Sequence, residues 1–229
     1  MGNWLENRKR EMTTVSAKID AKLVKELREK SGAPMGDCLK ALQETNGDIE
    51  AGFVALRKRG LASAQKKASR TTNEGAVGTY IHAGGKIGVL IELNCESDFV
   101  ARTDDFQELL KDIAMHIASS DPRYVRPDDV TIADLEREKE VYRAQALATG
   151  KPAPVIERIV DGKMAKFYEE VCLLEQPFIK DQAVSIKELI AQKVGKLGEN
   201  ITVRRFARFK VGAPDWTVAT TKAVEAAPE

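Results

Sequence analysis

Residues 92–102 read Glu-Leu-Asn-Cys-Glu-Ser-Asp-Phe-Val-Ala-Arg and join a strand pattern to a helix pattern. Before this segment, every second residue places an aliphatic side chain on one face, which is typical of a half-buried antiparallel strand: Ile87, Val89, Ile91 and Leu93. After it, Asp104 and Asp105 begin a segment whose apolar residues repeat with helical period: Phe106, Leu109, Leu110, Ile113, Ala114, Ile117 and Ala118. The residues from Ser97 to Val100 therefore lie between two well-packed elements.

Phe99 is the residue of this junction whose environment decides its role. A phenylalanine in such a turn either fills the local core or is presented to a partner. Exposure statistics favour the core. The residue pattern alone leaves both interpretations open.

The segment Asn94-Cys95-Glu96-Ser97-Asp98-Phe99-Val100 also matches a known motif. It resembles the hallmark of the elongation factor Ts family, a Thr-Asp-Phe-Val sequence after a strand that ends in Asn-Cys. Ser97 replaces the usual Thr and keeps the hydroxyl. The resemblance extends over roughly residues 16 to 212, and its further matches are Leu23 to Leu42, Ala114 to Ala118, Gly150 to Pro152, Glu175 to Phe178, and Gly198 to Ile201 with Arg204-Arg205.

The resemblance implies a guanine-nucleotide exchange factor for the translation GTPase elongation factor Tu, bound in its GDP-bound and nucleotide-free forms. The partner-binding residues it implies are Ser97, Asp98, Phe99 and Val100. In the family, the Asp-Phe pair enters between two helices of the GTPase and displaces the magnesium ion that joins protein and phosphates. Loss of that ion removes a large positive charge that holds GDP. No cofactor of the chain's own is implied.

The resemblance implies secondary partner contacts at Arg28, Met35, His82, Leu197 and Gly198. Around Met35 the chain lacks a second Met and a Lys of the family pattern. Without the family, Met35 is expected to pack in a helix turn, and His82 to face solvent at a hairpin.

Composition is compatible with this role and argues against others. The chain has 229 residues, 31% charged and 43% hydrophobic, and a formal net charge of +1, which is typical of a globular protein of one or two domains. This charge argues against direct nucleic-acid binding, and no apolar run approaches the roughly 20 residues that span a bilayer. The widely spaced Cys38, Cys95 and Cys172 indicate neither a disulfide framework nor a metal site, so we expect a cytoplasmic protein.

The N-terminal part predicts three short helices between Asp20 and Gly60. Asp20 and Asp48 are expected N-caps, and Gly32, Gly47 and Gly60 are each expected to end a helix. Such a bundle is similar to a ubiquitin-associated-type three-helix domain, which the family also carries. We assign it to residues 16–62, followed by a linker over 63–75.

The remainder predicts an α+β domain over 76–212, with a three-stranded antiparallel sheet and packed helices. Ala83-Gly84-Gly85 supplies a tight turn between two strands. Thr131 with Asp134, and Ser185 with Glu188, are spaced as capping boxes. Residues 213–229 resemble a disordered tail. The expected strands are 77–82, 86–94 and 201–210, and the expected helices are 104–119, 131–148, 152–169 and 185–196.

Catalysis of a chemical reaction is not expected. Cys95 and His82 form a Cys/His nucleophile only if both lie at one end of the hairpin, and we expect Cys95 to be a small core residue instead. His116 flanks an apolar helix stripe and is expected to be a hydrogen-bonded structural histidine. No nucleophile elbow or phosphate-binding loop is present in the sequence, so the chain is expected to act on GDP only through its partner.

The length predicts a homodimer. Longer family members carry two copies of the hairpin core, whereas this chain carries one, and a second copy of the chain would restore a two-copy platform. A single sheet also exposes an apolar face or an unpaired edge. The alternative function is an adaptor, in which the ubiquitin-associated-like domain recruits a partner and the α+β domain is a scaffold, but this leaves Asp98 and Phe99 without a purpose.

Overall fold

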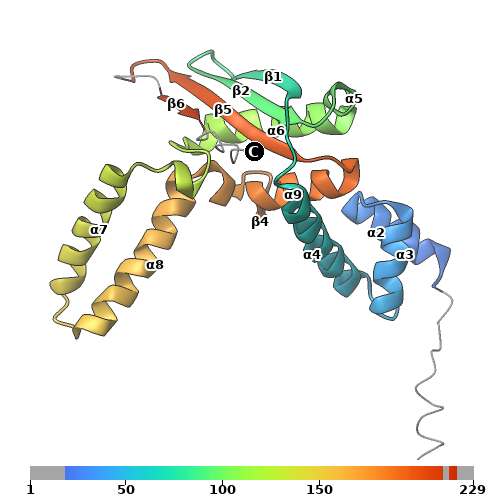
Figure 1. The fold of residues 1–229 in the computed structure, drawn as a ribbon, viewed down its shortest axis with the longest axis horizontal. Coiled ribbons are helices and arrows are strands. Elements are labelled where there is room, and N and C mark those ends of the chain that lie inside the picture. The colour runs from blue at the N-terminus through green and yellow to red at the C-terminus, as the bar shows by residue number, and fades with distance from the viewer. Residues whose placement is uncertain (1–18, 214–216, 221–229) are drawn as a thin grey trace, which may run out of the picture. The chain divides into compact units, whose positions relative to one another are not determined.

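The computed structural model describes residues 19–213 and 217–220 of the chain, which are coloured in Figure 1. The chain divides into two compact units, Met1–Ser63 and Ala64–Glu229. The division falls inside a helix, and the predicted domain limits at residues 62 and 76 stay predictions.

Three helices make up the described part of the first unit: α2 (Ala21–Ser31), α3 (Met35–Glu44) and the first turns of α4 (Ile49–Lys67). The three predicted helices are confirmed. The Asp20 carboxylate caps α2 by accepting a hydrogen bond from Lys22 N at 2.9 Å, and α2 ends at Gly32 in the left-handed conformation. The buried core of the unit consists of Val24, Leu27, Cys38, Ala41 and Leu42.

The prediction that Gly60 ends the third helix is wrong. Helix α4 continues to Lys67, so the first residues of the predicted 63–75 linker are helical. A glycine ends a helix when it adopts the left-handed conformation, and Gly60 has no positive φ. Inside a helix one glycine costs only about 1 kcal/mol relative to alanine, which the helix-favouring residues after Gly60 offset.

The second unit contains, in its described residues, a four-stranded antiparallel sheet in the order β1-β2-β5-β6. Its strands are β1 (Glu74–Ile81), β2 (Ile87–Cys95), β5 (Ile201–Lys210) and β6 (Thr217–Thr220). The α+β fold class and the three predicted strands are confirmed. Between β1 and β2, Gly84 and Gly85 have φ angles of 87° and 67°, as a tight hairpin turn requires.

The prediction of a disordered tail is wrong for residues 217–220. These residues form β6, which pairs with β5 from Arg205 to Arg208. The segment contains the β-branched residues Thr217, Val218 and Thr220, which favour strands. The prediction of disorder used the overall Ala, Thr and Pro content of the tail and missed this short strand pattern. Residues 214–216 and 221–229 of the predicted tail lie outside the described residues.

Helices cover one face of this sheet (Figure 1). Helix α6 (Asp104–Ser120) packs on β1 and β2 and also contacts α9 (Ile186–Leu197). Helices α7 (Ile132–Leu147) and α8 (Ala153–Val171) form an antiparallel hairpin with its own small core. These helices confirm the four predicted ones. The one-turn helix α5 (Asp98–Ala101), the 3-10 turns η1 (Pro127–Asp129) and η2 (Leu173–Glu175), and the short pair β3 (Pro177–Phe178) and β4 (Asp181–Ser185) complete the described unit.

The two predicted capping boxes have different outcomes. At α9 the box is complete, because Ser185 Oγ accepts a hydrogen bond from Glu188 N and the Glu188 carboxylate accepts one from Ser185 N. At α7 only half forms: Thr131 Oγ1 accepts from Asp134 N at 3.1 Å. The Asp134 carboxylate accepts hydrogen bonds from Thr131 Oγ1 and from Tyr124 Oη at 2.5 Å instead.

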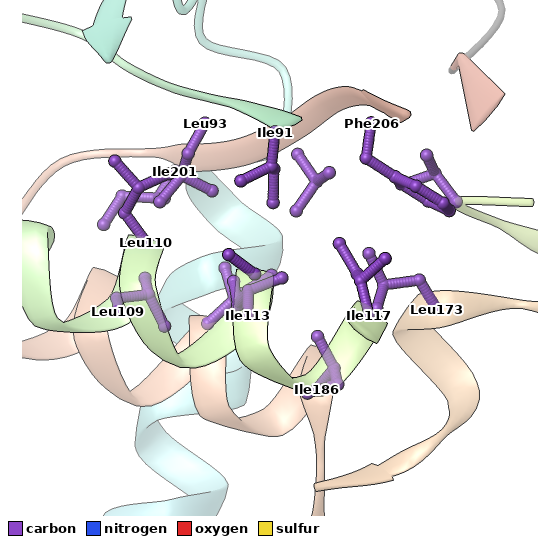
Figure 2. Packing of buried hydrophobic residues seen from close by; sticks show 14 of the residues in the cluster. Ile91, Leu93, Leu109, Leu110, Ile113, Ile117, Leu173, Ile186, Ile201 and Phe206 are labelled. Carbon is purple, nitrogen blue, oxygen red and sulfur yellow. The ribbon is translucent and has the colours of Figure 1, made fainter. Parts of the chain in front are cut away.

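The inner face of the sheet and α6 form the main core. Figure 2 shows aliphatic and aromatic side chains of the sheet above those of α6. Gly78 lets α6 approach β1 closely, because a Cβ at this position would lie 2.6 Å from Leu110 Cγ. The fully buried side chains of this core include Ile91, Leu93 and Phe206 from the sheet and Phe106, Leu109, Ile113 and Ile117 from α6.

The outer face of the sheet carries large apolar side chains that are not buried. Successive side chains of β1 point alternately to the inner and the outer face of the sheet. Val77 and Ile81 point outward and are 63% and 66% exposed. Ile81 lines a shallow groove together with Leu90, Phe209 and Val211. This outer apolar face, defined by Val77, Ile81, Leu90, Phe209 and Val211, contrasts with the tightly packed inner face.

Candidate partner-binding site

The segment Ser97 to Val100, here called the Phe99 turn, connects β2 to α6 through the one-turn helix α5. Phe99 is 82% exposed, whereas the neighbouring Ala101 is buried and Val100 packs against the main core. The interpretation of Phe99 as a core residue is therefore wrong. The turn rests on the core through Val100 and Ala101 and presents the phenyl ring to solvent.

Hydrogen bonds fix the Phe99 turn on both sides. On the α6 side, Thr103 Oγ1 donates to Val100 O at 2.8 Å, and Gln107 Nε2 donates to Ala101 O at 2.7 Å. On the β2 side, Ser97 donates from its backbone N and its hydroxyl to the Glu199 carboxylate, at 3.0 and 2.6 Å. The exposed ring is thus carried by a turn with a defined conformation.

Asp98 forms an ion pair with Arg102 one helical turn later, with Arg102 Nη2 donating to Asp98 Oδ2 at 2.6 Å. Both side chains are largely exposed, so the pair is worth little to stability. Ser97, not Asp98, occupies the N-cap position of α5. The Asp98 carboxylate is accessible to a partner that can replace Arg102.

Cys95 and His82 do not meet. Cys95 is buried at the end of β2, and its thiol donates to Ser97 O at 3.0 Å. Burial raises the pKa of this thiol to about 11, and the nearby Glu199 carboxylate adds to the rise. His82 lies at the hairpin turn, at the other end of β2, which is about 26 Å away at roughly 3.3 Å per residue. A thiol of this kind is protonated at neutral pH, so the Cys/His nucleophile interpretation is wrong.

The secondary candidates are spread over the molecule. Arg28 is exposed in the last turn of α2, and Met35 is exposed at the start of α3. His82 is exposed, with Nδ1 3.3 Å from Tyr80 Oη. Leu197 and Gly198 lie at the end of α9, directly before Glu199, so within the second unit they lie next to the Phe99 turn, whereas His82 lies at the other end of β2.

His116 is a buried structural histidine, as predicted. Its Nε2 lies 2.9 Å from Gln176 Oε1, and the Gln176 amide donates to Glu170 O at 2.7 Å. Burial lowers the pKa of the His116 imidazole. The histidine therefore joins α6 to the segment after α8 in its neutral form.

Sequence reasoning missed two residues of this site. Arg102 could have been found from its spacing of four residues from Asp98, which places the two side chains on one helix face. Glu199 could not, because it contacts Ser97 across 102 residues of chain.

Residues 63–213 match the family model described as Elongation factor TS. The chain belongs to the elongation factor Ts family. Among its relatives, the protein named Elongation factor Ts from Koribacter versatilis is 69% identical over 90% of this chain and 94% of the relative. Those of the same name from Solibacter usitatus and Carboxydothermus hydrogenoformans are 59% and 55% identical, over 86% and 85% of this chain and 92% and 89% of each relative.

Membership of the elongation factor Ts family confirms the resemblance and makes this chain a translation elongation factor. The matched residues include the whole Phe99 turn and Glu199. Within the described ranges, every helix is too short or too polar to traverse a lipid bilayer.

Proposed function

We propose that the chain is the guanine-nucleotide exchange factor of elongation factor Tu, and that the Phe99 turn performs the exchange. The observation that carries this proposal is the 82% exposure of Phe99 on a turn that is hydrogen-bonded on both sides. An aromatic ring that is exposed to water on an ordered turn is thermodynamically unfavourable in the free chain. Such rings are typical hot spots of protein–protein interfaces.

The proposed mechanism is a shift of the GTPase between two states. The chain binds elongation factor Tu with GDP, Phe99 and Asp98 enter between two helices of its nucleotide-binding domain, and the magnesium ion is displaced. Each tenfold gain in GDP release requires about 1.4 kcal/mol of preferential binding to the open, nucleotide-free form. Arg28, Met35, His82, Leu197 and Gly198 are proposed as further contacts. The chain performs no bond chemistry itself.

Release of a fluorescent GDP analogue from elongation factor Tu tests this function. We expect substoichiometric amounts of the chain to accelerate release, and the chain alone to hydrolyse no GTP. Release at the intrinsic rate of the GTPase, or hydrolysis by a tag-free preparation of the chain, would contradict the proposal.

We further propose that the functional form is a homodimer associated through the outer apolar face. Ile81 and Leu90 line one apolar groove with Phe209 and Val211, and Val77 is exposed on the same face of β1, so a second copy of the same face can cover this surface. On the β5 side the described sheet ends in the four-residue strand β6, and so short an edge strand offers few backbone groups for edge-to-edge association. A dimer also supplies His82 from a second copy, whereas within one chain His82 and the Phe99 turn lie at opposite ends of β2.

Light scattering over micromolar concentrations tests the dimer. Leu90→Glu is expected to give a monomer, because it places charge in the middle of the outer apolar face. Val141→Glu on α7 is the matched control, since Val141 is 45% exposed and Leu90 is 46% exposed, and this variant should stay dimeric. A monomeric parent chain would contradict the dimer, and a dimeric Leu90→Glu variant would contradict this interface.

The adaptor function is not favoured. It assigns activity to the N-terminal helices and leaves the rest as scaffold, yet the family match covers residues 63–213 and includes the exposed Phe99. In a pull-down from lysate, the exchange function predicts that one GTPase dominates the captured proteins, and a dominant partner of another class would favour the adaptor.

A further inference from the structure

Two glutamates join the Phe99 turn to the connection between α9 and β5. Glu199 accepts the two hydrogen bonds from Ser97 N and Oγ, at 3.0 and 2.6 Å. Glu96, the residue before Ser97, accepts one from Asn200 N at 2.6 Å, and this backbone amide holds the pKa of the Glu96 carboxyl below its usual value. Each carboxylate therefore binds the main chain of the segment that carries the other.

The backbone at the end of α9 directs Glu199 toward the turn. Gly198 is the C-cap of α9 and is left-handed, with φ 82° and ψ −2°, a conformation that residues with a Cβ rarely adopt. The chain reverses there, and the next side chain meets Ser97. The predicted contact residue Gly198 thus has a structural reason as well, because it determines where Glu199 lies.

Ser97 uses its hydroxyl for Glu199 and not for the helix it precedes. Ser97 is the N-cap of α5, yet its side chain makes no capping hydrogen bond to α5. A helix of one turn does not hold its own conformation in water, so the direction of Phe99 depends on contacts from outside α5. Thr103 and Gln107 supply them on one side, and Glu199 supplies them on the other, through charge-assisted hydrogen bonds of about twice the usual strength.

We infer that Glu199 is a positioning residue for nucleotide exchange, which holds Ser97 so that Phe99 is presented in its binding direction before the partner arrives. The inference rests on the proposed exchange function. A turn ordered in advance loses less conformational entropy on binding, so Glu199 contributes to exchange through Ser97 without being required as a contact of its own.

The test compares Glu199→Ala, Glu199→Gln, Ser97→Ala and the double variant Ser97→Ala/Glu199→Ala. Glu199→Ala should slow GDP-analogue release from elongation factor Tu about tenfold at limiting concentrations of the chain, as expected for two lost hydrogen bonds to a charged group. Glu199→Gln keeps one acceptor oxygen and should lose less.

In the free chain, amide hydrogen exchange at Ser97 and Phe99 should accelerate in Glu199→Ala, while the melting temperature changes little. Glu175→Ala is the matched control, because Glu175 is, like Glu199, a partly buried glutamate, and its ion pair is with Lys187 and not with the turn.

The outcomes separate this inference from the function on which it rests. A parent chain that does not accelerate release overturns both. With an active parent chain, a normal rate for Glu199→Ala overturns the inference alone, as does a rate loss without faster amide exchange at Ser97. The double variant should lose less than the sum of the losses of Ser97→Ala and Glu199→Ala, because both single changes remove the same hydrogen bond. Fully additive losses would mean that the two residues act independently, which also overturns the inference.

Discussion

Phe99 and Phe106 stand on the two sides of Thr103, yet Phe99 is 82% exposed and Phe106 is 0% exposed. Phe106 begins the apolar stripe of α6, and the residues three and four positions later are Leu109 and Leu110. The residues three and four positions after Phe99 are Arg102 and Thr103, which are polar.

The difference shows how the same residue type acquires two roles within one short segment. In a helix, side chains three and four residues apart share a face, so Phe106 continues an apolar face while Phe99 stands alone on a polar one. The first ring contributes to folding and the second is free to contribute to binding. The following variants test this division, in order of decreasing expected effect.

Phe106→Ala should lower the free energy of unfolding by about 3 to 5 kcal/mol, because it leaves a cavity in the main core. Urea denaturation of the parent chain and the variant measures this loss. A loss below about 1 kcal/mol would remove the distinction between the two phenylalanines.

Phe99→Ala should change the free energy of unfolding by less than about 0.5 kcal/mol, because truncating an exposed ring opens no cavity. Binding to elongation factor Tu should weaken by roughly 2 kcal/mol, which is about 30-fold in GDP release at limiting concentrations. Melting temperature and release rate are measured on the same preparation. A large fall in melting temperature with normal release per folded molecule would return Phe99 to the core.

His116 extends the comparison to a buried polar group. Its pKa in the folded chain is below the ordinary 6.5 because of burial, so the unfolded chain takes up this proton first as pH falls. Neutral His116 therefore contributes its full share to the free energy of unfolding above about pH 6.5. As the pH falls from there to the lower pKa of the folded chain, this share is lost by at most about 1.4 kcal/mol per pH unit.

Urea denaturation between pH 5.5 and 7.5 measures the slope, and His116→Gln should flatten it. The carboxyl groups of Glu96, Asp105 and Asp134 have lowered pKa values and titrate at more acidic pH than this window. An unchanged slope in His116→Gln would assign the pH dependence to another group.

The Asp98–Arg102 ion pair should give the smallest effects. Asp98→Asn and Arg102→Ala should each change the free energy of unfolding by less than about 0.5 kcal/mol, since the pair is exposed. Asp98→Asn should slow GDP release by a smaller factor than Phe99→Ala, through loss of a charge that engages the partner. A stability loss above about 1 kcal/mol would show that Asp98 holds the turn and is not primarily a contact.

The sequence predicted the elements whose residues repeat over several turns, such as α6 and β2, because burial on one face imposes that repeat. It failed where a short segment depends on its neighbours: β6 forms only against β5, and α4 passes Gly60 because adjacent residues favour the helix. At the site, the exposure of Phe99 was within reach of the sequence, since Arg102 and Thr103 offer no apolar face. The contact between Ser97 and Glu199 was not, because no local pattern relates residues so far apart.

In strand β1 the large aliphatic side chains of Val77 and Ile81 face solvent, whereas Gly78, which has no side chain, faces α6. This is the reverse of the usual arrangement, in which large apolar side chains face the core. In a single copy the aliphatic side chains of Val77 and Ile81 gain little hydrophobic free energy from their position, so β1 is a candidate for local opening without loss of the rest of the fold. Its first residue, Glu74, pairs with Cys95, and β1 also contacts α5. If the proposed dimer forms over the outer apolar face and Phe99 engages the GTPase as proposed, the two events would be thermodynamically linked through β1, because ordering β1 also orders an element that contacts α5.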